Sequence, residues 1–160
     1  IKLMSYVGLA TIRKVAPTVK WQPAKPPCDF DTLQAIITHR YDVMTRFVKS
    51  VRADSAAEIA KLKAGANLPQ NWNLDSFRRW LYKDPAELAA ADKAALDSLL
   101  GKSERLQTVY RMRQDLSAIW SRSTASREQL LEQLQAWCKR AEDSGIQSLQ
   151  EFSVRLRSYA

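Results

Sequence analysis

The sequence predicts an all-α fold, a multi-helix bundle of about six to eight helices preceded by an amphipathic segment and a Pro-rich strap. Its 160 residues include only four Gly and six Pro, while the helix-favouring residues Ala, Leu, Gln, Glu, Lys and Arg are abundant. Apolar residues recur with the helical period along most of the chain. No stretch alternates for long between apolar and polar residues, and no Asn-Gly or Asp-Gly pair marks a hairpin.

Residues 1–28 are expected to form an amphipathic basic segment and a Pro-rich linker. Leu3, Val7 and Ala10 are spaced for one face of a short helix with cationic neighbours. Pro17 ends this helix, and three further prolines keep the linker extended. The sequence shows no secretory signal and no apolar run of the roughly 20 residues that cross a bilayer. We therefore expect residue 1 to be a boundary inside a longer protein.

The helical domain is expected to span residues 29–160. Asp29 or Asp31 caps its first helix, which extends past residue 51. Residues 55–63 either prolong this helix or begin another before Gly65. The side chains expected on its apolar side are Leu33, Ile36, Ile37, Tyr41, Met44, Phe47, Val48 and Val51.

Two helices are expected in the middle of the chain. The first surrounds FRRWLYK and is buried through Phe77, Trp80 and Leu81. The second begins with Asp84 as N-cap and Pro85 in the first helical position, and Glu87 completes a capping box. Gly101 ends it.

Three helices are expected in the C-terminal third. The first follows SERLQTVYRMRQDLSAIWSRS, the second is opened by Ser126 and Gln129 and ends at the Ser-Gly pair at 144–145, and the third is capped by Ser148 with Glu151. Their apolar stripes hold Leu106, Val109, Tyr110, Leu116, Ile119, Trp120, Leu130, Leu131, Leu134, Trp137, Cys138, Ala141, Leu149, Phe152, Leu156 and Tyr159.

The net charge of +8 is concentrated near the start of the sequence. Residues 1–52 hold nine Lys or Arg against three Asp, whereas residues 53–160 hold sixteen Lys or Arg against fourteen Asp or Glu. This distribution indicates a polyanionic partner, either a phospholipid surface or a nucleic acid. A charge that serves solubility alone is the alternative.

The sequence shows no active site. It has a single histidine, His39, which is expected on a polar helix face, whereas a metal site needs several ligands at suitable spacing. Cys28 and Cys138 lie 110 positions apart, which is typical of reduced thiols in a reducing compartment, and Cys138 is expected to be packed and inert. No motif of a hydrolase, metalloprotease or nucleotide-binding protein occurs. Whether the chain belongs to an enzyme stays open.

The segments LMSYVGLATIRKVAPT, DTLQAIITHRYDVMTRFVKSV and LQTVYRMRQDLSAIWSRSTASREQLLEQLQAWCKRAEDSGIQSLQEFSVRLRSYA resemble the C-terminal cytosolic helical region of bacterial integral-membrane fatty acid desaturases. This resemblance implies a non-catalytic tail of an oxidoreductase of unsaturated fatty acid biosynthesis, which inserts a double bond, usually Δ9, into an acyl chain on a carrier such as CoA. The di-iron cofactor would be bound by the upstream part of that protein, and no cofactor would be bound by this chain.

The same resemblance implies a position on the cytoplasmic side of the bacterial inner membrane. The partners would be the upstream membrane part of the same polypeptide, the anionic membrane surface, and an acidic electron donor or acyl carrier. Contacts with the membrane surface would then come from Lys2, Arg13, Lys14, Lys20 and Trp21.

The part of the chain from YRMRQDLSAIW onward is also similar to the helical region of DDE-type insertion-sequence transposases. In those proteins such a segment accompanies a catalytic core with an RNase-H-like sheet, and no strand pattern for that core occurs here. The likeness implies a DNA-binding module, with phosphate contacts from Arg40, Arg46, Lys49 and Arg52, although these four do not share one helix face. A stand-alone protein-interaction domain is the third possibility.

Overall fold

The computed structural model of the protein describes residues 26–65, 73–122 and 124–160. Every regular element in these ranges is helical, which confirms the predicted all-α bundle. The expected short helix through Leu3, Val7 and Ala10 lies outside the described residues. The α-helices are α2 (Phe30–Thr38), α3 (Arg40–Ala64), α4 (Leu74–Trp80), α5 (Ala90–Leu100), α6 (Glu104–Ser121), α7 (Arg127–Asp143) and α8 (Gln147–Arg157), and the 3-10 turn η1 (Pro85–Glu87) lies between α4 and α5.

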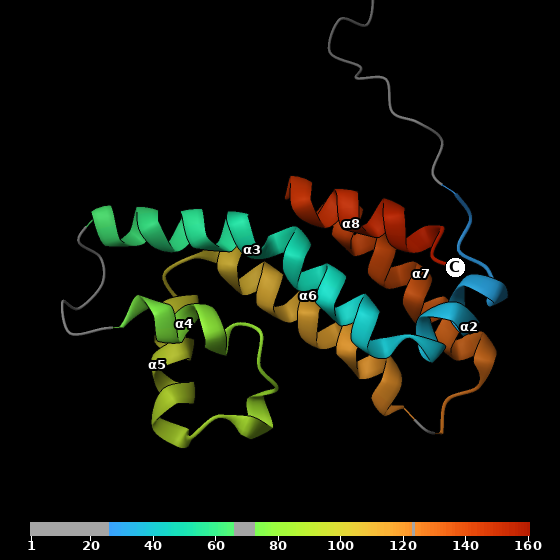
Figure 1. Ribbon diagram of the computed structural model, residues 1–160, viewed down its shortest axis with the longest axis horizontal. Coiled ribbons are helices and arrows are strands. Elements are labelled where there is room, and N and C mark those ends of the chain that lie inside the picture. The colour runs from blue at the N-terminus through green and yellow to red at the C-terminus, as the bar shows by residue number, and fades with distance from the viewer. Residues whose placement is uncertain (1–25, 66–72, 123) are drawn as a thin grey trace, which may run out of the picture.

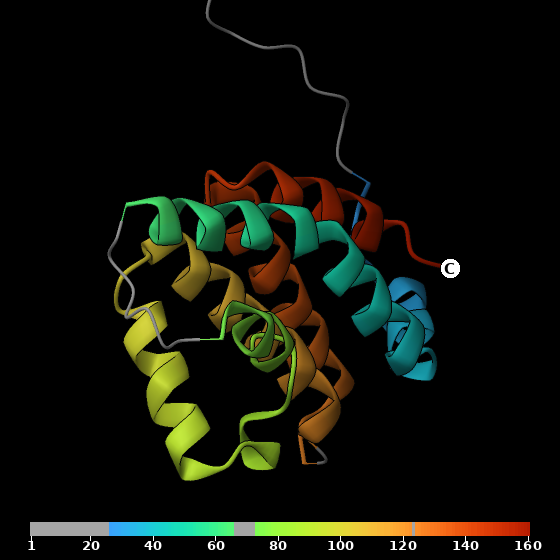
Figure 2. The ribbon, with the colours of Figure 1, turned by 60° about the vertical axis from the view of Figure 1, so that its left-hand side comes forward.

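The longest helix, α3, organises the bundle. It lies beside α8 in one layer, and α6 and α7 form a second layer beneath these two (Figures 1 and 2). Helix α2 packs against α7 near the start of α3, while α4 and α5 pack near the other end of α3 (Figure 1). The chain therefore brings α3 and α8, which are far apart in sequence, into direct contact.

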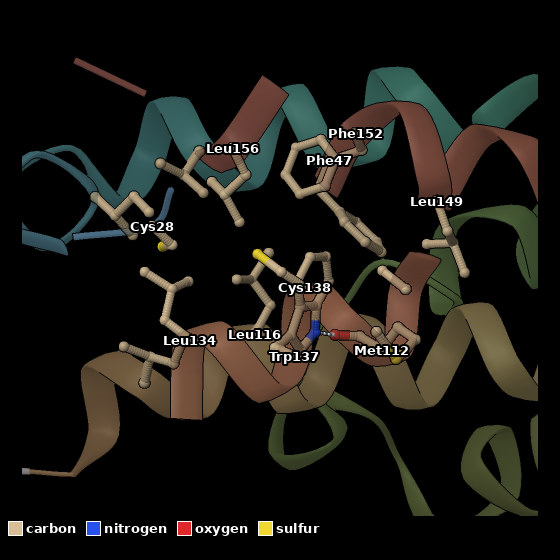
Figure 3. Close-up of a cluster of buried hydrophobic side chains, with 14 of the residues drawn as sticks. Cys28, Phe47, Met112, Leu116, Leu134, Trp137, Cys138, Leu149, Phe152 and Leu156 are labelled. Atoms are coloured by element: carbon tan, nitrogen blue, oxygen red, sulfur yellow. Dashed lines mark hydrogen bonds between the residues drawn. The ribbon is translucent and has the colours of Figure 1, made fainter. Parts of the chain in front are cut away.

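The main hydrophobic core lies between these two layers and is built around Trp137 (Figure 3). The Trp137 side chain is 1% exposed, and its indole N–H donates to the Met112 carbonyl at 2.8 Å. Its ring meets Phe47 edge-on, with centroids 6.2 Å apart, and Phe152 with centroids 5.7 Å apart. Phe47 and Phe152 also pack edge to face at 5.3 Å. These three aromatic rings join α3, α7 and α8, because each helix contributes one of them.

A second hydrophobic cluster joins the far end of α3 to α4, α5 and the start of α6. Phe77 is buried there, and the half-buried Trp80 packs edge-on against it with centroids 5.2 Å apart. Trp120 packs in the same half-buried way on the main core. The buried members of the second cluster are Ile59, Leu62, Phe77, Leu81, Leu96, Leu99, Leu100 and Leu106.

The long helix predicted from residue 29 onward is interrupted at His39. Asp29 caps α2 by accepting a hydrogen bond from the Thr32 N–H at 2.9 Å, which decides between the two expected caps. His39 then leaves the helical region of backbone space, with φ −117° and ψ 47°, and α3 begins at the next residue. This break changes which side of the helix faces the core. Tyr41 is therefore 86% exposed, and its expected place on the apolar side is wrong. Residues 55–63 prolong α3.

The helix expected from Asp84 onward is also divided. The Asp84 carboxylate accepts a hydrogen bond from the Ala86 N–H at 3.0 Å, but the turn that it caps is the 3-10 turn η1. Leu88 then adopts extended backbone, with φ −90° and ψ 138°, so α5 begins only at Ala90. Gly101 ends α5 as expected.

The cap predicted for the last helix is wrong. Helix α8 begins two residues earlier than a Ser148 cap would place it, with Ile146 in the N-cap position and no side-chain cap. The Ser148 hydroxyl instead donates to the Asp54 carboxylate of α3 at 2.6 Å. The Ser148 hydroxyl, which the sequence predicted to cap the helix, therefore forms a tertiary contact between α3 and α8 instead.

The capping box predicted at the start of α7 is confirmed. The Ser126 hydroxyl accepts from the Gln129 N–H at 3.2 Å, and the Gln129 side-chain oxygen accepts from the Ser126 N–H at 2.9 Å. We expect Ser126→Ala to lower the free energy of unfolding by about 1 kcal/mol, because the Gln129 N–H loses the hydroxyl that accepts its hydrogen bond. Urea denaturation measures this loss. Ser98→Ala, at an exposed site inside α5, is the control, and an equal loss there would contradict the cap assignment.

Candidate functional site

A cationic groove with a volume of about 270 Å³ lies between α3 and α8. Three of the side chains that line it are positively charged, two carry hydroxyl groups and three are apolar. None of them is a carboxylate. We call this feature the α3–α8 groove, and it is lined by Val43, Arg46, Lys49, Ser50, Phe152, Arg155, Leu156 and Tyr159.

The floor of the α3–α8 groove is part of the main core. Val43, Phe152 and Leu156 are 1%, 3% and 2% exposed. The edge-to-face pair of Phe152 with Phe47 fixes the two helices against each other. The floor is therefore rigid, and it holds the polar side chains of the rim at fixed helical positions.

The cationic side chains line the rim from both helices. Arg46 and Lys49 are exposed on α3, and Arg155 is exposed on α8. The Arg155 guanidinium donates to the Ser50 hydroxyl at 3.3 Å, and that hydroxyl donates to the Arg46 carbonyl at 2.9 Å. Three positive charges beside hydroxyl groups are suited to phosphate oxygens, which accept charge-assisted hydrogen bonds.

One carboxylate, that of Asp42, lies at the edge of the groove. Its Oδ2 atom accepts from the Tyr159 hydroxyl at 2.6 Å and is 2.9 Å from Arg46 Nε. The hydrogen bond from Tyr159, followed by the contact with Arg46, lowers the pKa of Asp42 below its ordinary value. The Arg46 guanidinium also lies over the Tyr159 ring, 5.3 Å from its centroid. Asp42 is therefore ionised at neutral pH and shares Arg46 with the groove.

The other arginine of α8 faces away from the groove. Arg157 donates to Glu142 of α7 through Nε at 2.8 Å and through Nη2 at 3.2 Å. The Ser153 hydroxyl donates to the same carboxylate at 2.5 Å. The hydrogen bond to Glu142 raises the pKa of Arg157 above its ordinary value. Arg155 and Arg157 therefore have different roles: Arg155 lines the groove, and Arg157 holds α8 against α7.

The structure brings together two of the four predicted phosphate contacts. Arg46 and Lys49 line the α3–α8 groove. The Arg40 guanidinium instead lies over the Trp120 ring, 5.9 Å from its centroid. Arg52 is exposed and lies near Tyr82, where its charge opposes the rise in the pKa of Tyr82 that burial causes.

Arg155 and Tyr159 were not expected at this site. They are four residues apart, Arg155 in α8 and Tyr159 two residues beyond its end, and this spacing is the one signal in the sequence that places them on the same side. The five residues expected to touch a membrane surface are not described by the structure: Lys2, Arg13, Lys14, Lys20 and Trp21.

The described residues hold no cluster of three or more His, Cys, Asp or Glu side chains that could bind a metal ion. The part of the chain that the structure describes also has no helix long and apolar enough to cross a membrane. His39 is exposed as expected, with its ring beside Tyr159 at a centroid distance of 6.0 Å. Cys28 and Cys138 are free and buried, and the adjacent Cys138 thiol and burial both raise the pKa of Cys28.

Residues 37–160 match a protein family described as Transposase, DDE_Tnp_ISL3. No curated protein and no solved structure gives a match. The matched range covers more than half of the chain and includes every residue that lines the α3–α8 groove.

This match overturns the interpretation of the chain as a desaturase tail, together with the role in lipid metabolism that this implied. In the part of the chain that the structure describes, the segments that carried that resemblance are amphipathic helices, whose apolar side chains mostly fill the two cores. An amphipathic pattern indicates that helices pack against one another, and helices pack in this way in proteins of many different functions. The transposase likeness of the C-terminal part is the one that the family match supports.

Proposed function

Because the chain belongs to the DDE_Tnp_ISL3 family of transposases, we propose that its helical domain binds nucleic acid and that the α3–α8 groove contacts the phosphate backbone. Transposases act on DNA, and a nucleic acid is the polyanion that suits the net charge of +8. We assign binding, and no catalytic step, to this groove.

The observation that carries this proposal is the charge of the groove lining. Arg46, Lys49 and Arg155 converge on one hollow whose lining has no carboxylate. A guanidinium group can bind a phosphate through two parallel hydrogen bonds, and an ammonium group adds a point charge. The apolar floor has no side-chain donor or acceptor for the hydrogen-bonding groups on the edge of a nucleic-acid base. The groove therefore suits backbone contacts, which position a protein on a duplex without reading its sequence.

Removal of two groove charges tests this function. We expect Lys49→Ala with Arg155→Ala to weaken binding to a 20-base-pair duplex by about tenfold or more in 0.1 M salt, because two phosphate contacts are lost. The slope of log affinity against log salt should become shallower by about 1.8. Fluorescence anisotropy at several salt concentrations measures both quantities.

The matched control is Arg111→Ala with Lys139→Ala, which removes one Arg and one Lys from exposed positions on α6 and α7. This variant has the same net charge as the groove variant, so overall charge cannot account for a difference between them. Circular dichroism establishes that both variants fold. If the control loses as much affinity as the groove variant, or if the groove variant binds like the wild type, the assignment of the groove is wrong.

A further inference from the structure

Asp42 is the acidic group in closest contact with the cations of the α3–α8 groove. Its carboxylate lies 2.9 Å from Arg46 Nε, on the same helix one turn earlier. The Tyr159 hydroxyl, from the segment after α8, donates to the same carboxylate oxygen at 2.6 Å. Two elements of the groove therefore hold Asp42 against Arg46.

A phosphate bound by Arg46 would lie close to this carboxylate, which contacts the same guanidinium. The Asp42 side chain is 46% exposed and the Arg46 side chain is 63% exposed, so both are accessible to a ligand. A carboxylate and a phosphate both accept hydrogen bonds from a guanidinium, so they compete for Arg46, and like charges at close range repel. The Asp42 carboxylate is charged at neutral pH, as an ordinary aspartate is, and the contacts with Tyr159 and Arg46 lower its pKa further.

We propose that Asp42 is an internal counter-anion that limits the affinity of the α3–α8 groove for phosphate, and this inference rests on the proposed nucleic-acid function. In the free protein Asp42 neutralises Arg46. The binding energy of a single phosphate is too small to displace Asp42 from Arg46. A polyanion that also contacts Lys49 and Arg155 makes several contacts at once, and their sum is enough to displace it. The pair therefore favours an extended phosphate backbone over isolated anions.

The test replaces Asp42 with asparagine, which keeps an oxygen for the Tyr159 hydroxyl and removes the charge. We expect Asp42→Asn to bind the 20-base-pair duplex about three- to tenfold more tightly in 0.1 M salt, with a salt slope steeper by about 0.9. Inorganic phosphate should also compete with the duplex at lower concentration for this variant than for the wild type.

The matched control is Asp54→Asn. Asp54 lies on the same helix and also pairs with an arginine, Arg105, at 3.4 Å, but it does not line the groove. This control should bind DNA within about twofold of the wild type. A second comparison adds Arg46→Ala to both the wild type and the Asp42→Asn variant, and the gain from Asp42→Asn should shrink because Arg46 is the group that Asp42 occupies.

The outcomes separate this inference from the proposed function. If removal of the Lys49 and Arg155 charges weakens DNA binding but Asp42→Asn binds like the wild type, the proposed role of Asp42 is wrong and the proposed function stands. An equal gain for Asp54→Asn would also overturn the inference, since overall charge would then explain it. If the wild type does not bind DNA at all, the proposed function fails first.

Discussion

Replacing Trp137 with alanine is expected to lower the free energy of unfolding by about 3–5 kcal/mol. The side chain is 1% exposed, and it packs edge-on against Phe47 and Phe152. The substitution leaves a cavity where α3, α7 and α8 meet, and it removes the hydrogen bond from the indole to the Met112 carbonyl. Urea denaturation followed by circular dichroism measures the loss.

Two control variants show whether the loss comes from the position of Trp137 in the core. Trp137→Phe keeps an aromatic ring and should lose less than the alanine variant, because the remaining cavity is smaller. Trp120→Ala removes a half-buried tryptophan of α6 and should also lose less. A loss below about 1 kcal/mol for Trp137→Ala, or an equal loss for Trp120→Ala, would contradict the central place of Trp137 in the core.

Removing the Glu142 carboxylate is expected to cost about 3–5 kcal/mol of stability. The Glu142 side chain is 6% exposed and the Arg157 side chain is 16% exposed. Glu142→Ala therefore leaves the partly buried Arg157 charge without its carboxylate, and it removes one of the two acceptors of the Ser153 hydroxyl, which keeps the Cys138 carbonyl. The variant also loosens α8, one wall of the α3–α8 groove. Thermal and urea denaturation measure the loss.

The double variant Glu142→Leu with Arg157→Met separates a lost contact from an uncompensated charge. It should recover much of the stability, because replacing both members of a buried pair by apolar groups is often nearly neutral. Asp115→Ala breaks the exposed pair with Arg140, whose side chains are 45% and 54% exposed, and should cost at most about 1 kcal/mol. If Glu142→Ala lowers the free energy of unfolding by no more than Asp115→Ala does, burial does not make the pair of Glu142 with Arg157 more stabilising than an exposed pair.

Local patterns in the sequence predicted most of the helices. The cap at Asp29, the capping box at Ser126 and the stop at Gly101 depend on neighbouring residues, so a single sequence contains them. Ser148 is used by Asp54, a distant residue, and at the break at His39 the Ile37 carbonyl accepts a hydrogen bond from the distant Trp120 indole N–H at 3.2 Å. Those contacts override local preference and cannot be derived from residues that are adjacent in the chain.

The candidate site was only half predictable for the same reason. Arg46 and Lys49 belong to the basic first third of the chain, which the charge distribution had singled out. Arg155 joins them only because α8 packs beside α3, which brings together residues 105 positions apart, as its hydrogen bond to Ser50 shows. Asp42 likewise carries no signal in the sequence, which places it inside one long helix, and only the structure puts it in the first turn of α3 beside the groove.

Nuclear magnetic resonance of the isotope-labelled protein, titrated with a 20-base-pair duplex, tests the central claim most directly. If the α3–α8 groove binds the phosphate backbone, the largest changes in amide chemical shift should fall in residues 43–50 of α3 and 152–159 in and after α8. These changes should disappear when the salt concentration is raised. Changes confined to α4 and α5, or to the outer faces of α6 and α7, with none in the groove, would contradict the account.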